Sequence, residues 1–200
     1  MTEQHSHTRH QYITSEPKSS LSDDMDQWQD EIIKGLRADS HTAAVELVDR
    51  YYRKIYWFMR RLGHQRSVSE DLTQDCFIQI WQHIGQLRNA TALNSWIYRI
   101  ALNVSRQYLR SNRIRKTSSF DGYDQINEVN STTELFEARE EIEKLTTFVS
   151  QLPEKQQKII ILHYMEQLTI YEVSQVLNIS QGTVKSRLNR ALEKLRRNMS

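Results

Sequence analysis

The sequence contains few of the residues that cross-link a chain or interrupt its secondary structure. Its 200 residues include one cysteine, two prolines and five glycines. The single cysteine, Cys76, excludes an internal disulfide framework and fits a reducing cytoplasm. The scarcity of glycine and proline leaves little turn chemistry for the many short strands of a sandwich or a barrel. The composition therefore favours an all-α fold.

Long apolar runs and catalytic patterns are also missing. No run of about 18 apolar residues, the length that a transmembrane helix needs, is present. The N-terminus lacks the hydrophobic region of a signal peptide, so we expect a cytoplasmic protein with no membrane insertion. There is no glycine-rich phosphate loop, no spaced metal-ligand motif and no nucleophile beside an obvious base. We expect no enzymatic activity, no cofactor, no metal and no small-molecule substrate.

Charge is unevenly distributed along the chain, although the net charge is only +2. Residues 88–116 contain seven bases and no acid, and residues 183–200 contain six bases and one acid. Between these blocks, residues 117–150 contain eight acids and two bases. Two basic blocks that flank an acidic one predict two nucleic-acid-facing surfaces on separate modules.

Hydrophobic periodicity predicts two groups of helices. The first group is expected near residues 24–37, 40–62, 67–84 and 95–113, and the second near 133–151, 153–165, 169–177 and 180–198. Residues 114–132 mix serine, asparagine, aspartate, glycine and threonine, which is typical of a linker. The predicted organisation is a disordered tail (1–23), a first helical domain (24–113), the linker (114–132) and a second helical domain (133–200).

Small polar residues stand where N-caps are expected. The candidate caps are Ser40, Ser67, Asn94 or Ser95, and Thr169. Glu70 gives Ser67 the spacing of a capping box, in which the two residues satisfy each other's backbone N–H groups. Gly63 would end the helix that begins after Ser40.

The helix expected around residues 71–81 has two unlike faces. An apolar stripe at helical spacing should point into a core; its members are Leu72, Cys76, Ile80 and Ile84. A polar face carries Asp71, Gln74, Asp75 and Gln82. Asp71 and Asp75 are a like-charge pair at i,i+4, which costs about 0.2–0.5 kcal/mol on an isolated helix. Acids near a helix N-terminus can simply complement the helix dipole, so a solvated face and a docking face both remain open here.

The last two helices have helix-turn-helix form. Thr169 would cap the first helix, Ser174 is the small residue where the helices cross, and residues 178–180 form a three-residue turn. The second helix opens with polar and basic residues: Gln181, Thr183, Lys185, Ser186, Arg187 and Arg190. Side chains at the start of such a helix reach base edges in the major groove. DNA binding is therefore the preferred interpretation, and an ordinary helical hairpin with a basic solvated face is the alternative.

The helix near residues 95–113 supplies the second basic surface. Its polar face carries Arg99, Asn103, Arg106 and Arg110. The polar segment before it, residues 86–94, can present side chains to an unstacked base; it contains Arg88, Asn89, Thr91 and Asn94. Trp96 and Tyr98 are candidates for base stacking, although Trp96 is better explained as a core residue.

Four ordered segments resemble the extracytoplasmic-function (ECF) sigma factors, the small two-domain initiation factors of bacterial RNA polymerase. Residues 71–81 (DLTQDCFIQIW) are similar to that family's D-L-x-Q-E-x-F-x-x-x-W helix, and residues 96–103 (WIYRIALN) to its W-L-x-R-I-A-x-N segment. Residues 152–157 (LPEKQQ) and 181–188 (QGTVKSRL) resemble its L-P entry and its G-T-V-K-S-R-L recognition helix. The order and spacing agree over residues 40–197.

The resemblance implies three interfaces. Asp71, Gln74, Asp75 and Gln82 would dock on the clamp helices of the largest subunit of core RNA polymerase, and the second domain would meet its flap. The −10 element would be recognised and opened by Arg88, Asn89, Thr91, Asn94, Arg99, Asn103, Arg106 and Arg110. The −35 element would be read by Gln181, Thr183, Lys185, Ser186, Arg187 and Arg190. The linker would thread toward the active-site cleft of the polymerase, and an anti-sigma factor is an implied partner. The alternative function is an autonomous helix-turn-helix regulator that binds a palindromic operator as a dimer.

The sequence departs from the family pattern at a few positions. Asp75 stands in place of the usual glutamate, and Gln107 in place of a frequent aspartate. Asn89 and Leu93 occupy loop positions where a glycine and a phenylalanine are common. Gln167 replaces the glycine that usually precedes the helix-turn-helix.

Overall fold

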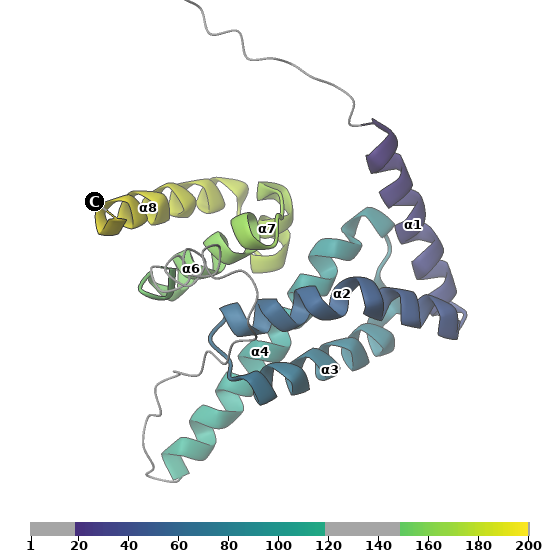
Figure 1. The fold of residues 1–200 in the computed structure, drawn as a ribbon, viewed down its shortest axis with the longest axis horizontal. Helices are drawn as coiled ribbons and strands as arrows, with labels where there is room; N and C mark the ends of the chain where they lie inside the picture. Colours follow the sequence, from purple (N-terminus) through teal and green to yellow (C-terminus); the bar gives the residue numbers. More distant parts are fainter. Residues whose placement is uncertain (1–18, 119–148, 200) are drawn as a thin grey trace, which may run out of the picture.

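The computed structural model describes residues 19–118 and 149–199, and these residues are helical with no strand (Figure 1). The long helices are α1 (Ser19–Arg37), α2 (His41–Arg61), α3 (Arg66–His83), α4 (Leu93–Ser118) and α8 (Gln181–Met199). The shorter ones are α6 (Glu154–Ile160) and α7 (Ile170–Leu177). Two 3-10 turns, η1 (Ile84–Gln86) and η2 (Ala90–Ala92), join α3 to α4, and a π-helical turn, η3 (Ile161–Met165), extends α6. The predicted all-α class is confirmed.

Helices α1 to α4 form a first module around a shared apolar core. Ile55, Phe58 and Met59 of α2 are fully buried, as are Ile97 and Ala101 of α4. Each of these side chains removes apolar surface from water, which stabilises the fold by about 1.5–3 kcal/mol for a side chain the size of isoleucine or phenylalanine. The apolar stripe predicted around residues 71–81 is part of this core, because Leu72, Cys76, Ile80 and Ile84 are all buried.

Both predicted ends of α2 are confirmed. The Ser40 hydroxyl oxygen accepts a hydrogen bond from the Ala43 amide at 3.4 Å, so Ser40 is the N-cap. Gly63 follows the helix with φ 93°, a left-handed conformation that glycine adopts without a Cβ clash. The α2 helix therefore stops where the glycine allows the chain to reverse.

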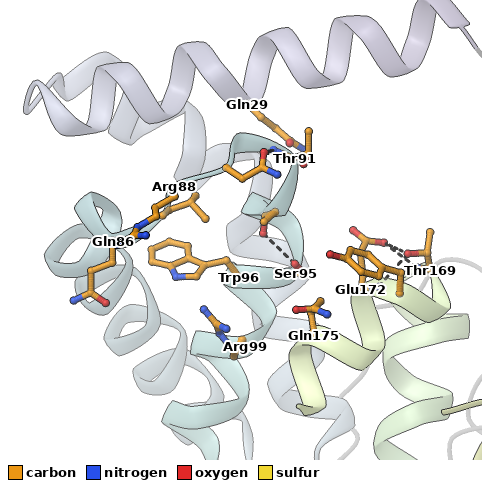
Figure 2. A pocket seen from close by; sticks show the side chains of 14 residues that line it. Gln29, Gln86, Arg88, Thr91, Ser95, Trp96, Arg99, Thr169, Glu172 and Gln175 are labelled. Atoms are coloured by element: carbon orange, nitrogen blue, oxygen red, sulfur yellow. Dashed lines mark hydrogen bonds between the residues drawn. The ribbon is translucent and has the colours of Figure 1, made fainter. Parts of the chain in front are cut away.

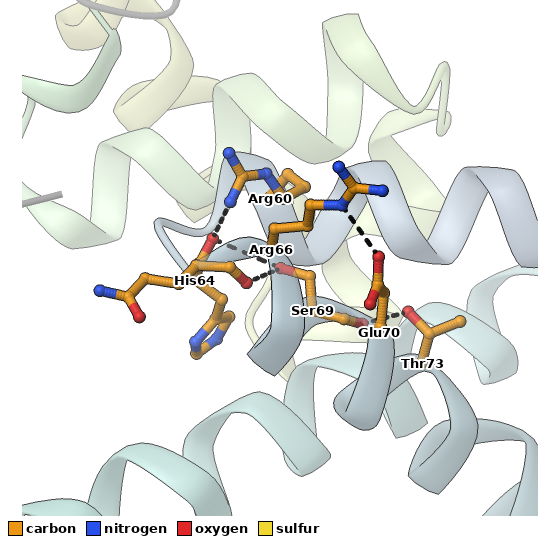
Figure 3. Close-up of polar contacts among 7 residues, drawn as sticks. Arg60, His64, Arg66, Ser69, Glu70 and Thr73 are labelled. Carbon is orange, nitrogen blue, oxygen red and sulfur yellow. Dashed lines mark hydrogen bonds and ion pairs between the residues drawn. The ribbon is translucent and has the colours of Figure 1, made fainter. Parts of the chain in front are cut away.

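The start of α3 differs from the prediction. No capping box forms between Ser67 and Glu70, because α3 begins at Arg66 with Gln65 as an N-cap that makes no side-chain bond. Glu70 instead pairs with Arg66 at 3.2 Å, one helical turn earlier (Figure 3). The hydroxyl of buried Ser69 donates to the Gln65 carbonyl at 2.9 Å. Charge pairing along the exposed face thus replaces the predicted reciprocal cap.

The predicted cap of α4 is also wrong. The helix begins before Asn94 and Ser95, so both residues lie in its first turn. Asn89 caps the preceding turn η2 instead, because its side-chain oxygen accepts from the Thr91 amide at 3.1 Å. The Ser95 hydroxyl donates to the Ala92 carbonyl at 3.0 Å. A 3-10 turn that runs directly into the helix moves the cap upstream of the expected position.

Two helix ends extend beyond their predicted limits. Helix α1 begins at Ser19 rather than near residue 24, and α4 continues to Ser118 rather than ending near residue 113. The first residues of the predicted linker are therefore helical. The rest of that linker, residues 1–18 of the predicted tail and most of the helix expected at 133–151 lie outside the described residues.

Helices α6, α7 and α8 form a second module, and α7 and α8 have the predicted helix-turn-helix form. Thr169 and Glu172 make a complete capping box at the start of α7. Asn178 adopts φ 52° and ends α7, and α8 begins after the predicted three-residue turn. The apolar face of α8 packs inward: Val184, Leu188, Ala191 and Leu195 are buried, and Leu192 is half-buried.

The second module packs against the first, with α7 beside α4 (Figure 1). Arg61, at the end of α2, forms an ion pair with Glu166 at 2.6 Å, and the Tyr98 hydroxyl of α4 donates to the other oxygen of that carboxylate at 2.7 Å. Polar bonds thus join the two modules. None of the helices that the structure describes combines the length and apolar character needed to span a membrane.

Candidate polymerase and promoter interfaces

The acidic face of α3 is exposed as predicted. Asp71, Gln74, Asp75 and Gln82 are all exposed. The buried residues of α3 lie on the opposite face: Ser69, Leu72, Thr73, Cys76 and Ile80. Cys76 is fully buried, and burial raises the pKa of its thiol to about 12, which fits its predicted role as a small apolar residue. Within the described residues, neither aspartate has a cationic partner. Among residues 19–118 and 149–199, the like-charge pair is therefore uncompensated.

Two large apolar side chains share this face and were missed by the sequence analysis. Ile78 is 54% exposed and Trp81 is 42% exposed. They follow Asp71, Gln74 and Asp75 at helical spacing, so acids and apolar groups form one continuous strip. The signal was available in the spacing, because neither residue falls on the stripe of Leu72, Cys76 and Ile80. An exposed tryptophan beside unpaired acids is suited to a protein partner.

The residues predicted for the −10 element line two hollows along α4. The first is a cleft of about 790 Å³, to which the loop before α4 contributes Arg88, Asn89 and Thr91, and α4 contributes Arg99 (Figure 2). The second, of about 560 Å³, is lined by Asn103, Arg106, Gln107, Arg110 and Ser111. Seven of the eight predicted residues thus line concave surfaces, and each hollow contains two arginines that can meet the phosphates of a single strand.

The eighth residue, Asn94, lies outside these hollows. Its side-chain amide donates to Glu172 of α7 at 3.2 Å, and its carbonyl oxygen lies 3.4 Å from the Tyr51 hydroxyl, within the reach of a hydrogen bond. Asn94 therefore already has partners from two other helices. No signal in the local sequence indicated that a residue 78 positions away would bind it.

Part of the lining of the larger cleft comes from elements that were not assigned to this site. Gln29 belongs to α1, and Thr169, Glu172 and Gln175 belong to the second module (Figure 2). The helix-turn-helix module thus stands directly across from the residues expected to read the −10 element.

The two aromatic stacking candidates are both inside the protein. Tyr98 is only 1% exposed and meets Phe58 edge to face, with ring centroids 5.3 Å apart. Burial, reinforced by the Glu166 carboxylate, raises the pKa of its phenol. Trp96 is 7% exposed, which confirms its assignment to the core, although part of it lines the larger cleft. The suggestion that Tyr98 stacks on a base is therefore wrong.

The predicted reading residues of α8 are accessible at the start of the helix. Gln181, Lys185, Ser186 and Arg190 are exposed, and Thr183 and Arg187 are half-buried. The Ser180 hydroxyl caps the helix by accepting from the Thr183 amide at 3.1 Å. The Ser186 hydroxyl donates to the Thr183 carbonyl at 3.1 Å, so it is used within the helix. The long side chains of Gln181, Lys185, Arg187 and Arg190 remain the groups best suited to reach a groove.

These features define a class of protein: a helical module with an acidic strip and two hollows that contain arginines, followed by a basic helix-turn-helix. Two family models match the chain, and they match these two modules. Sigma-70 region 2 matches residues 47–115, and Sigma-70, region 4 matches residues 142–195. Together the two matches cover more than half of the chain.

Similar proteins agree with this assignment. The ECF RNA polymerase sigma factor SigW of Bacillus subtilis is 29% identical over 178 residues, which cover 84% of this chain and 94% of SigW. The ECF RNA polymerase sigma-E factor of Escherichia coli K12 is 28% identical over 156 residues, covering 74% of this chain and 81% of that protein. The chain belongs to the sigma-70 family, in its extracytoplasmic-function group.

Solved structures show the same fold. The sigma factor RpoE of Bartonella quintana, solved with the anti-sigma factor NepR, has a TM-score of 0.66 at 18% identity, with 76% of this chain and 93% of that chain covered. CnrH, solved with the cytosolic domain of CnrY, has a TM-score of 0.63 at 21% identity, with 88% and 96% covered. As a sigma factor, the chain binds core RNA polymerase and directs promoter recognition; the comparisons give no support to an autonomous regulator.

Proposed function

We propose that this sigma factor divides its work among three surfaces: the acidic strip of α3, the hollows along α4 and the start of α8. The observation that carries the proposal is the uncompensated acidic strip with its exposed Trp81, since a solvated face needs neither feature. Basic surfaces face DNA, and this acidic strip faces the polymerase.

In this proposal, the strip docks on the clamp helices of the largest subunit of core polymerase. Asp71, Gln74, Asp75 and Gln82 supply the polar contacts, and Ile78 and Trp81 supply the apolar ones. Charge complementarity with a basic partner would steer the encounter, and burial of Trp81 in the interface would slow dissociation. The second module would meet the flap of the polymerase.

The hollows of α4 bind the −10 element as it opens. Arg99, Arg106 and Arg110 neutralise phosphates, and the loop that carries Arg88, Asn89 and Thr91 holds an unstacked base of the non-template strand. Unpairing a base costs a few kcal/mol, which the binding of the extruded base offsets. The protein needs no chemistry of its own for this step, and it acts as a binding factor rather than an enzyme.

The start of α8 reads the −35 element as intact duplex. Gln181 is suited to adenine, and Arg187 and Lys185 are suited to guanine or phosphate. Binding of α8 to the −35 element fixes the position of the polymerase on the promoter. The bases of the −10 element, which lie downstream, are then placed at the hollows of α4.

An anti-sigma factor is the proposed regulatory partner, and the cytoplasm, which holds the polymerase, is the proposed location. The support is the similar Bartonella protein, which was solved with its anti-sigma factor NepR. Exposed apolar groups on α2 and α3 offer a surface for such a partner: Val45, Val48, Tyr52, Ile78 and Trp81.

The docking role is tested by reversing the charge of the strip. The double substitution Asp71→Lys and Asp75→Lys is expected to abolish capture of core polymerase while circular dichroism stays unchanged, because both residues are exposed. The matched control is Asp30→Lys with Asp49→Lys, which reverses two exposed carboxylates of α1 and α2. Capture by the first variant at the level of the control would reject the docking role. Tight, sequence-specific binding of duplex DNA by the isolated chain would instead favour an autonomous regulator.

A further inference from the structure

Helix α1 supports the loop before α4, although it lies outside the residues that the family models match. In the first module the match covers residues 47–115, whereas α1 spans Ser19–Arg37. The helix packs against both turns of the loop, η1 and η2, and the Arg37 guanidinium donates a hydrogen bond to the Leu87 carbonyl. This bond holds the backbone directly before Arg88 and Asn89, to which the proposed function gives an unstacked base. A helix without a family motif therefore borders the −10 site.

Trp28 fixes α1 on α2. Its ring stacks on the ring of Tyr51, with centroids 6.3 Å apart, and Cζ of Arg50 lies 4.0 Å from the Trp28 ring centroid. The indole N–H donates a hydrogen bond to the Glu46 carboxylate. Because Trp28 is held by three residues of α2, the next residue, Gln29, has a defined position relative to the loop.

Gln29 carries a hydrogen-bond acceptor that the protein does not use. Its side chain extends from α1 toward Thr91 and lines the cleft of about 790 Å³ (Figure 2). Gln29 is only 6% exposed, and among the residues that the structure describes no donor reaches its buried Oε1. A buried acceptor without a donor destabilises a protein, and native structures contain few of them. A ligand that brings a donor into the cleft removes this cost.

The other polar side chains on this side of the cleft differ from Gln29. The side-chain oxygen of Asn89 is already used, because it accepts from the Thr91 amide at 3.1 Å. Arg88 and Arg99 are exposed, and their charge is suited to phosphates, which carry no base identity. The neutral, buried amide of Gln29 is therefore the group suited to read a base, while the arginines hold the backbone of the strand.

We infer that Gln29 reads an extruded adenine in this cleft, which makes α1 part of the −10 recognition surface. The inference rests on the proposed function, in which the loop and α4 hold an unstacked base. An amide side chain pairs with adenine through two hydrogen bonds: its oxygen accepts from the 6-amino group, and its nitrogen donates to N7. Rotation of the Gln29 side chain toward the bound base gives Oε1 the donor that it lacks.

The pairing selects adenine because of how its edge is arranged. Adenine offers an amino donor and the N7 acceptor side by side. Guanine places an O6 acceptor beside N7, and cytosine and thymine have no N7. A glutamine that binds the other three bases therefore makes at most one of the two bonds on this edge.

The test uses the holoenzyme, assembled from core polymerase and this chain, with short single strands of DNA. Each strand consists of thymidines and carries adenine, cytosine, guanine or thymine at its central position. Competition measured by fluorescence anisotropy gives the affinity of each strand, and core polymerase alone gives the background. The strand with adenine is expected to bind about tenfold more tightly than the all-thymidine strand, the discrimination of one two-bond contact. Replacing that adenine by purine, which lacks the 6-amino group, is expected to remove the preference.

The variant Gln29→Leu is expected to bind the strands with adenine, purine and thymine alike. Leucine is of similar size and leaves no buried acceptor, so the Tm is expected to be unchanged or higher, which separates a reading role from a structural one. The matched control is Gln27→Leu, which removes an exposed amide from the same helix and is expected to keep the preference for adenine.

The outcomes separate this inference from the proposed function. A preference for adenine that persists in Gln29→Leu would overturn the inference. Equal affinity of the native holoenzyme for all four strands would overturn it too, and so would a preference for cytosine or guanine. Failure of the proposed function has a different signature: Arg106→Gln and Arg110→Gln would then leave the affinity of every strand unchanged, whatever its central base.

Discussion

His64 and Ser105 are hydrogen-bonded inside the first module, with Nε2 of the imidazole 2.7 Å from Oγ of the serine. The pair joins the turn after α2 to α4, and the imidazole also meets Tyr108 edge to face. His64 is buried, and this burial lowers its pKa from 6.5 to about 4. The folded protein therefore holds His64 in its neutral form.

Stability is expected to fall in mild acid because of this histidine. Below pH about 6.5 His64 becomes protonated in the unfolded chain. In the folded protein the same side chain stays neutral down to pH about 4. The contribution of neutral His64 to the free energy of unfolding is complete above pH 6.5. At pH 5, about 2 kcal/mol of that free energy is expected to be lost. Urea denaturation at pH 7.5 and at pH 5 measures the difference. His64→Asn, which stays neutral, is expected to lose less stability over the same interval, and an equal loss in both proteins would contradict the assignment.

Gln167 carries backbone strain that a glycine would relieve. It adopts φ 59°, a left-handed conformation that costs an ordinary residue about 1–2 kcal/mol. Glycine avoids this cost but loses about 0.5–1 kcal/mol through its greater freedom when unfolded. Gln167→Gly is expected to raise the stability by about 0.5 kcal/mol, seen as a Tm higher by about 1–2 °C. Asn178, with φ 52°, is the control: its change to glycine should alter the Tm less, because asparagine tolerates the left-handed region. A lower Tm for Gln167→Gly would refute the strain argument.

The capping box at the start of α7 is expected to stabilise the helix-turn-helix. The Thr169 hydroxyl donates to Glu172 Oε2 at 2.9 Å and accepts from the Glu172 amide at 3.2 Å. Thr169→Ala is expected to destabilise the protein by about 1 kcal/mol. Thr169→Ser keeps the hydroxyl and should retain most of that stability. Chemical denaturation compares the two, and equal losses would show that the methyl group, rather than the cap, is responsible.

Among the residues of α8, Arg187 carries the most specific prediction for recognition of the −35 element. If it makes two hydrogen bonds to a guanine, Arg187→Ala should cost about 1–3 kcal/mol and relax specificity at one upstream base. Run-off transcription by the holoenzyme on promoters with single-base changes in the −35 element measures both effects. Lys194→Ala, an exposed charge further along α8, is the control. A uniform loss over all promoters would identify Arg187 as a phosphate contact instead.

Periodic features of the fold were predictable because they repeat within one helix. The burial of Leu72, Cys76 and Ile80 follows from spacing alone, and so does the turn between α7 and α8, where Asn178 takes a left-handed conformation. The exposure of Asp71, Gln74 and Asp75 on α3 follows from the same spacing, whereas the roles assigned to these residues stay predictions.

Competition between alternative partners was not predictable from the local sequence. Glu70 has the right spacing to cap with Ser67, yet it pairs with the neighbouring residue Arg66, one helical turn earlier. Asn94 has the character of an N-cap, yet a 3-10 turn with its own cap at Asn89 precedes it. In each case two local interactions of similar strength compete, and the packing of the module decides between them.

Contacts between the modules had no sequence signal at all. Arg61 and Glu166 are 105 positions apart, and neither lies in a motif. Their pairing depends on how two separate cores come together, which periodicity within a helix does not encode.

The position of Glu166 has a consequence for how the two modules are held together. Both of its bonds, to Arg61 on α2 and to Tyr98 on α4, end on the same carboxylate. Because that carboxylate is almost completely buried, loss of one partner leaves one of its oxygens without a hydrogen bond and shielded from water. The two bonds therefore depend on each other, and their contributions to the contact are not additive.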